Sequence, residues 1–166
     1  MTAKPELPSA WITQFDGAGL DRKLDVSAVL ASVDDEGWPH LTYLSAGEVL
    51  AHDARRLTFL LWSTSRSAAN LLRGSQGVLH AVADGAVWET RLMSKPRANA
   101  TELTVFDAEV IDVRRHAAPY AEATGLIAFR LHDPAVTLDR WRLQIERMRQ
   151  EPRHSAASER GTPIAP

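Results

Sequence analysis

"LLWSTSRSAANLLRG", residues 60–74, marks the place where a strand gives way to a helix. The apolar run at 60–62 is typical of a strand end, and a helical pattern follows it and ends at Gly74. Four hydroxyl side chains and one guanidinium lie between the two patterns: Ser63, Thr64, Ser65, Ser67 and Arg66. This concentration of hydrogen-bond donors at a strand-to-helix junction requires an explanation.

Two explanations fit these residues. A helix that begins near Ser65 presents unpaired N–H groups and the positive end of its dipole, which together attract an anion. The hydroxyls and the guanidinium of Arg66 can donate hydrogen bonds to phosphate oxygens. Alternatively, Thr64 or Ser65 simply caps the helix while Arg66 points into water. The residues alone leave both explanations open.

The rest of the chain reads mainly as strands. Short β-branched or alternating runs predict six or so strands, with a weaker strand character in the polar connection 47–56. Tight turns are expected at 34–37 and at Asp84-Gly85, a dipeptide suited to positive φ. Pro39 lacks a ladder donor and belongs at the start or edge of its strand. The predicted strands are 26–33, 38–45, 57–62, 77–83, 86–93, 102–115 and 124–131, with a break at 94–101.

Consecutive hairpins without regular strand–helix alternation predict a mainly β fold, an antiparallel barrel with peripheral helices. The final helix is expected over 133–150, where one apolar stripe serves the core or a dimer seam; it comprises Leu138, Trp141, Ile145 and Met148. The organisation is one folded domain over 11–151, after a flexible N-terminus at 1–10 and before a disordered tail at 152–166.

Composition excludes several classes of protein. With 166 residues and 45% hydrophobic content, the chain fits one domain, and a net charge of −2 without one-sign blocks argues against nucleic-acid or membrane-surface binding. The absence of cysteine removes disulfides, thiolate catalysis and cysteine metal sites. No signal peptide and no run of eighteen apolar residues is seen, so we expect a cytoplasmic protein.

The common catalytic motifs are missing. Ser45 and Ser75 do not lie in a G-x-S-x-G elbow, there is no Walker A loop, and the segment 17–22 lacks the third glycine of a dinucleotide fingerprint. The histidines lack metal-ligand spacing, so we expect no metal site. No side chain stands out as an acid or base, and the catalytic residues are unknown.

The order of these segments resembles the FMN-binding split β-barrel family related to pyridoxamine 5′-phosphate oxidase. The resemblance spans roughly residues 20 to 131, and it depends on two matching stretches. Residues 39–42, "PHLT", match the family pattern x-P-h-v-t-x-v, and residues 65–71, "SRSAANL", match S-x-K/R-x-x-N-L after an apolar strand. The implied fold is a split β-barrel of the FMN-binding type.

The resemblance implies a role for each matching residue. Ser65 and Arg66, with Ser67 beside them, would bind the FMN phosphate, which Thr42 would approach from the neighbouring strand. Trp62 and Ser63 would lie along the flavin ring and ribityl chain, and Thr64 belongs to the same cluster. Asn70 matches the family asparagine, for which a structural hydrogen bond is expected. Trp88 would reach the partner subunit's flavin or else pack in the core.

Two departures from the family pattern limit the expected activity. Many members carry lysine beside the phosphate-binding arginine, whereas this chain has Ser67, which removes a positive charge. The C-terminal arginine–histidine element of true pyridoxamine 5′-phosphate oxidases is missing, because Arg130 and His132 imitate it only within an internal predicted strand. The chain is therefore not expected to be a vitamin B6 oxidase.

The resemblance implies a homodimer with FMN in the grooves between subunits and hydride transfer to or from a small organic molecule. The leading expectation is thus a flavin-dependent oxidoreductase. Two alternatives stay open: a non-catalytic flavin binder for storage or stress sensing, and a dimeric barrel that has lost flavin. A deazaflavin in place of FMN also remains open, and the sequence names neither substrate nor electron donor.

Overall fold

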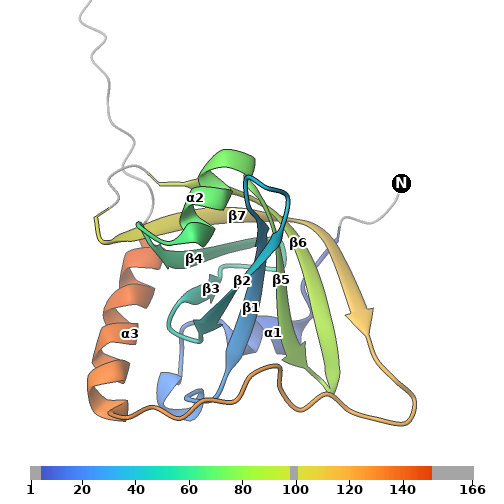
Figure 1. Ribbon diagram of the computed structural model, residues 1–166. Helices are drawn as coiled ribbons and strands as arrows, with labels where there is room; N and C mark the ends of the chain where they lie inside the picture. The colour runs from blue at the N-terminus through green and yellow to red at the C-terminus, as the bar shows by residue number, and fades with distance from the viewer. Residues whose placement is uncertain (1–4, 98–100, 151–166) are drawn as a thin grey trace, which may run out of the picture.

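The computed structural model describes residues 5–97 and 101–150. Seven antiparallel strands form one sheet in the order β2-β1-β5-β6-β7-β4-β3, which curls into a half-barrel (Figure 1). The strands are β1 (Ser27–Val33), β2 (Pro39–Ser45), β3 (Val49–Ala51), β4 (Arg56–Trp62), β5 (Gln76–Ala83), β6 (Ala86–Pro96) and β7 (Leu103–His116). The mainly β, split-barrel prediction is confirmed.

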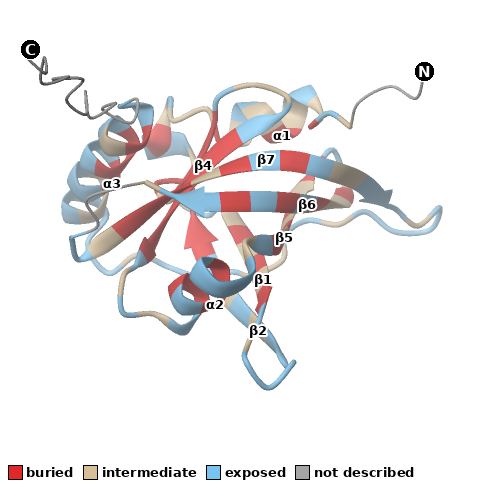
Figure 2. Cartoon of the chain, turned by 90° about the horizontal axis from the view of Figure 1, so that it is seen from above, coloured by how far each residue is buried: buried red, intermediate tan, exposed pale blue. Residues whose placement is uncertain are grey.

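The expected turns join the expected strands. Asp34 accepts hydrogen bonds from the N–H groups of Glu36 and Trp38, which closes the β1–β2 hairpin with Pro39 as the first residue of β2. Asp84 and Gly85 both have positive φ, at 49° and 67°, and join β5 to β6. Buried and exposed residues alternate along β6 and β7, as Figure 2 shows, because side chains point to opposite faces of a strand.

Apolar residues gather on both sides of the curled sheet. Inside the curl, helices α1 (Ser9–Gln14) and α2 (Arg66–Gly74) pack on the main core, with Trp11 and Phe15 fully buried. On the other side, helix α3 (Pro134–Arg149) and the short 3₁₀ helix η1 (Leu20–Arg22) cover a second core around Leu60 and Val105. The molecule therefore buries both faces of β4.

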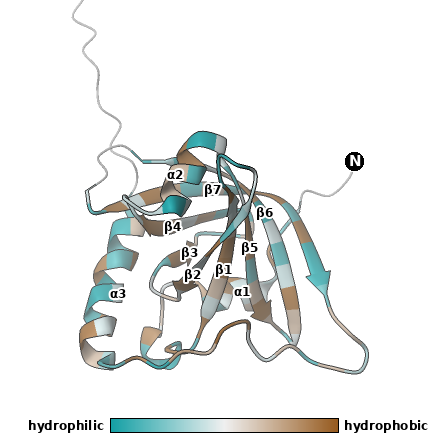
Figure 3. Cartoon of the chain, in the orientation of Figure 1, coloured by the Kyte–Doolittle hydropathy of each residue, from teal (hydrophilic) through white to brown (hydrophobic). Residues whose placement is uncertain are grey.

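Helix α3 places its predicted apolar stripe in this second core. Trp141, Ile145 and Met148 are buried and Leu138 packs against them, while hydrophilic residues alternate with hydrophobic ones along the helix in Figure 3. Trp141 requires Gly47, because a Cβ at that position would lie 2.1 Å from the Trp141 Cγ atom. The stripe serves the core of a single protomer.

One predicted strand is wrong. Residues 124–131 form no strand; the chain from β7 to α3 passes along the ends of other strands instead of beside one (Figure 1). In this segment the carbonyl oxygen of Ile127 accepts a hydrogen bond from Ser27 Oγ. Strand β7 already has β4 and β6 on its two sides, so this segment cannot add a strand next to β7.

Two predicted boundaries also move. The folded part begins before residue 11, since Leu7 is buried, its N–H donates to Ala54 O, and α1 starts at Ser9. Strand β6 extends to Pro96, so the break expected at 94–101 begins later. The predicted tail 152–166 lies outside the described residues. No helix in the described ranges is long and apolar enough to cross a membrane.

Candidate functional site

The junction at residues 63–67 is a capped helix start. Ser65 has extended backbone angles, and its side chain accepts a hydrogen bond from the N–H of Ala68, which makes it the N-cap of α2. The capping explanation from the sequence is therefore correct for Ser65. It does not account for the other donors, because the cap satisfies only one of the first N–H groups.

Several donors at this helix start remain free within the described chain. The backbone N–H groups of Arg66 and Ser67 donate to no described residue. The Arg66 guanidinium and the Thr64 hydroxyl are exposed, and neither has a hydrogen bond or ion pair with a described residue. These groups come from Thr64, Arg66 and Ser67, at the N-terminal end of α2, where the helix dipole is positive.

Thr42 and Ser67 are brought together from β2 and α2. Their hydroxyl oxygens form a hydrogen bond to each other, although 25 residues separate them in sequence. Ser67 is buried at 1% exposure, whereas Thr42 is half-buried. If Ser67 donates, the proton of the Thr42 hydroxyl is left for another acceptor. The structure thus places Thr42 beside the helix start.

Ser63 is hydrogen-bonded to the start of the neighbouring strand β7 and is therefore not one of the free donors. Its hydroxyl donates to Thr101 O at 2.7 Å and lies 2.8 Å from Thr104 Oγ1, and its N–H donates to Glu102 O. A hydroxyl has one proton, so Ser63 has none left for a phosphate in this arrangement. Its contacts fix the end of β4 against the start of β7.

Of the remaining predicted residues, Asn70 and Trp88 are engaged within the protein, and Trp62 is exposed. Asn70 is buried and donates to Ser32 Oγ at 3.0 Å, which is the expected structural hydrogen bond. Trp88 packs against the main core and donates from Nε1 to Ala83 O at 3.0 Å, which agrees with its packing role. Trp62 is 56% exposed at the end of β4, next to the free donors in sequence.

These residues fit a phosphate group. The cradle consists of two backbone N–H groups, the Thr64 and Thr42 hydroxyls and the Arg66 guanidinium, and none of these groups except the Thr42 oxygen has a partner among the described residues. Only one side chain in it carries a positive charge, because Ser67 stands where lysine is common in the resembling family. The arrangement can bind a phosphate mainly by directed hydrogen bonds.

A second polar cluster, which the sequence did not reveal, lies beneath the C-terminal end of α3. Arg97 from the end of β6 donates two hydrogen bonds to Asp107 on β7, at 2.8 and 2.6 Å, and further hydrogen bonds to the last carbonyl groups of α3. Thr58 Oγ1 on β4 is buried between Asp107 and His52. The four residues are 6 to 49 positions apart from their partners, and no sequence motif joins them.

The electrostatics of this cluster follow from its contacts. Burial raises the pKa of Asp107, but hydrogen bonds and charge from Arg97 and the hydrogen bond from Thr58 outweigh it, so the pKa lies below the usual 3.8. Burial lowers the pKa of His52 below 6.5, and the positive charge of Arg97 lowers it further. At neutral pH the Asp107 carboxyl is therefore ionised, and the His52 imidazole is neutral.

Comparison with known proteins agrees with this fold. No family model matches the chain. Among solved structures, a "putative pyridoxamine 5′-phosphate oxidase" from Lactobacillus delbrueckii has a TM-score of 0.53 and 17% identity, covering 68% of this chain and 97% of its own. HupZ from Group A Streptococcus also has a TM-score of 0.53, at 10% identity, over 70% of this chain and 98% of its own. At these identities the likeness concerns the fold, and the chain has the split β-barrel of pyridoxamine 5′-phosphate oxidase-like proteins.

One relative is closer in sequence. The uncharacterized protein YclD of Bacillus subtilis (strain 168) is 30% identical over 140 residues, which are 82% of this chain and 91% of that protein. The chain belongs to the family of YclD.

Proposed function

We propose that the protein binds FMN and that the start of α2 holds its phosphate. The observation that carries this proposal is the set of free donors around Arg66, in a chain whose fold is shared with pyridoxamine 5′-phosphate oxidase-like proteins. The backbone N–H groups of Arg66 and Ser67 would donate to phosphate oxygens along the helix axis. The guanidinium would add a charge-assisted pair from the side.

The surrounding residues would complete the site. The Thr64 hydroxyl would donate to the phosphate, and so would the Thr42 hydroxyl when it accepts from Ser67. Ser65 holds the first turn in place, and Trp62 exposes an indole at the end of β4. Bound FMN would supply hydride or electron transfer, so the activity proposed is that of a flavin-dependent oxidoreductase acting on a small organic molecule. The residues of this chain would bind and orient the cofactor.

The outer face of the sheet supports a homodimer as part of the same proposal. Val33, Leu41 and Tyr43 on β1 and β2 are 57%, 50% and 61% exposed, and Met93 on β6 is 43% exposed on the same face by its pairing register. Large apolar side chains gathered on one sheet face favour burial against another surface. A second copy of the chain would cover them and would flank the proposed flavin site.

The decisive experiment compares FMN with riboflavin, which lacks the phosphate. Each is titrated into the purified protein while tryptophan fluorescence and flavin absorbance are followed. FMN is expected to bind more tightly than riboflavin, and Arg66→Ala is expected to weaken FMN about 10- to 100-fold while leaving riboflavin unchanged. The residual difference between the two ligands then measures what the backbone donors contribute.

Arg73→Ala is the matched control. Arg73 lies on the same helix but at its other end, where it donates to Val33 O and Asn70 Oδ1. This variant removes the same charge without touching the helix start, so FMN affinity is expected to stay within about twofold. Equal binding of FMN and riboflavin to the wild type, or equal losses in the two variants, would overturn the phosphate site.

The oxidoreductase and dimer proposals have separate tests. Anaerobic mixing of the FMN-loaded protein with NADH or NADPH should bleach the flavin band faster than it bleaches free FMN; equal rates would favour a non-catalytic flavin binder. Tyr43→Glu places a charge on the exposed sheet face and should convert a dimer into a monomer in sedimentation velocity runs. A wild type that sediments as a monomer would contradict the dimer.

A further inference from the structure

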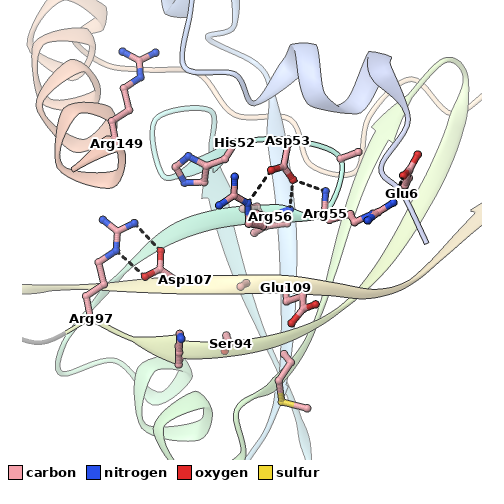
Figure 4. Close-up of a pocket in the computed structure, with 15 residues that line it drawn as sticks. Glu6, His52, Asp53, Arg55, Arg56, Ser94, Arg97, Asp107, Glu109 and Arg149 are labelled. Atoms are coloured by element: carbon pink, nitrogen blue, oxygen red, sulfur yellow. Dashed lines mark hydrogen bonds and ion pairs between the residues drawn. The ribbon is translucent and has the colours of Figure 1, made fainter. Parts of the chain in front are cut away.

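An open cavity of about 1040 Å³ lies on the same face of the sheet as α3, beyond the C-terminal end of this helix. Residues from β4, β6, β7, the turn at 52–55 and the end of α3 line it, and none comes from α2 or β2 (Figure 4). It therefore shares no residue with the proposed phosphate site at the start of α2, although Met93, on the sheet face proposed for the dimer, lines it. Most of the residues that line it are polar or charged, with both acidic and basic side chains.

The hydrogen bonds behind His52 determine which of its ring nitrogens carries the proton. Asp107 is ionised at neutral pH and can only accept, so the Thr58 hydroxyl donates its proton to Asp107 Oδ1 at 3.1 Å. The Thr58 oxygen must then accept from His52 Nε2, which lies 2.7 Å away. Neutral His52 consequently carries its proton on Nε2, and its Nδ1 has an unused lone pair.

This arrangement is held firmly from behind. Arg97 fixes Asp107 through two hydrogen bonds and is only 12% exposed, and Thr58 is fully buried. His52 itself is exposed and lines the cavity. A hydrogen-bonded chain of three residues thus orients one accessible imidazole, as in sites where a histidine accepts a proton or a hydrogen bond from a ligand.

The charges in the cavity are not all neutralised. Three of its carboxylates pair with arginines inside the cavity: Glu6 with Arg55, Asp53 with Arg56, and Asp107 with Arg97. Lys95 and Glu109 are exposed and form no ion pair with a described residue. Arg149 donates only to the backbone oxygens of Asp16 and Gly17. The cavity therefore has two positive groups without an ion pair inside it, Lys95 and Arg149, and one such carboxylate, Glu109.

We propose that this cavity is a second small-molecule site, in which His52 Nδ1 accepts a hydrogen bond from the ligand and Lys95 binds the ligand's anionic group. The ligand class that matches is a small carboxylic acid with a hydroxyl or ammonium group, since it offers an anion for Lys95 and a donor for His52. Glu109 accepts from any further donor. This site does not depend on flavin binding.

The protonation state of His52 is tested first. Long-range ¹⁵N–¹H NMR spectra of the uniformly labelled protein at neutral pH distinguish protonated from unprotonated ring nitrogens, and comparison with His52→Gln assigns the signal. The expected result is a neutral ring with the proton on Nε2. A proton on Nδ1 would overturn the proposal, because the acceptor would then be missing from the cavity.

Ligand binding is tested by titrating glycolate and following the His52 ring signals. Glycolate carries a carboxylate and a hydroxyl, acetate lacks the hydroxyl, and ethylene glycol lacks the anion. Saturable shifts are expected with glycolate, with acetate and ethylene glycol at least about tenfold weaker. Shifts no larger than those caused by sodium chloride at equal ionic strength would contradict the proposal.

Variants connect this binding to the proposed residues. Lys95→Met keeps the aliphatic stem and removes the charge, so it should weaken glycolate about tenfold. Arg91→Met is the control, since Arg91 lies on the same strand outside the cavity and neighbours Glu89. Equal effects of the two variants would show a general charge effect and overturn the site. FMN affinity serves as the independent readout and should remain unchanged in both variants.

Discussion

At the start of α2, hydrogen-bond donors outnumber acceptors, whereas beneath the end of α3 the polar side chains satisfy one another. Arg66 and Thr64 have no partner among the described residues, while Arg97, Asp107 and Thr58 form a continuous chain. The first cluster contributes little to folding and is ready to bind a ligand. The second links three strands and a helix, and contributes His52, Arg97 and Asp107 to the lining of a cavity. Substitutions should therefore separate binding from stability.

The largest expected effect is on stability, in the cluster beneath α3. Asp107→Ala leaves the guanidinium of Arg97 without its carboxylate, and the free energy of unfolding in urea should fall by about 3 kcal/mol. Asp112→Ala is the control, because Asp112 pairs with Arg114 on the same strand but in an exposed position, and should cost less than about 1 kcal/mol. Similar losses in the two variants would refute the distinction.

A change at the helix cap should affect binding without affecting stability. Ser65→Asp keeps a side chain that caps α2 and suits the positive end of its dipole, so the unfolding midpoint should stay the same or rise slightly. The new carboxylate would repel a phosphate, and FMN affinity should fall more than tenfold, by about 1.4 kcal/mol or more. Ser65→Ala should instead lower stability by about 1 kcal/mol. An unchanged FMN affinity in Ser65→Asp would remove the phosphate from this helix.

A smaller contrast is expected between two neighbouring hydroxyls. Ser63→Ala removes the hydrogen bonds to Thr101 and Thr104, so it should lower the free energy of unfolding by about 1 kcal/mol with a minor effect on FMN. Thr64→Ala removes an exposed hydroxyl without a described partner, so it should leave stability unchanged and weaken FMN a few-fold. Chemical denaturation and FMN titration of both variants measure the contrast. The reverse pattern would show that the hydroxyl roles are misassigned.

The smallest expected effect is the pH dependence of His52. Its pKa lies below 6.5 in the folded protein because of burial and the charge of Arg97, so the unfolded chain binds this proton more readily. Stability from the neutral ring is present above pH 6.5 and is lost as the pH falls below it. Between pH 7.5 and 5.5 the unfolding free energy should decrease by less than about 1 kcal/mol more in the wild type than in His52→Gln. Identical pH profiles would show that His52 titrates normally.

Local signals in the sequence were sufficient where neighbouring residues decide the structure. The hairpin turns at 34–37 and 84–85, the helix start at Ser65 and the apolar stripe of α3 were all predictable, since each depends on residues a few positions apart. The strand predicted at 124–131 failed for the opposite reason. Alternation shows that a segment can be a strand, but only the tertiary structure shows which strand, if any, lies beside it.

The sequence by itself determined the strands, the turns, the capped helix and the donors offered at its start. Only the tertiary structure decided which donors stay free: it engaged Ser63 with β7, paired Thr42 with Ser67 and left Arg66 exposed. It alone assembled His52, Thr58, Asp107 and Arg97 into one chain beside a cavity. Hydrogen bonds between distant residues require strand register and helix packing, which no local pattern encodes.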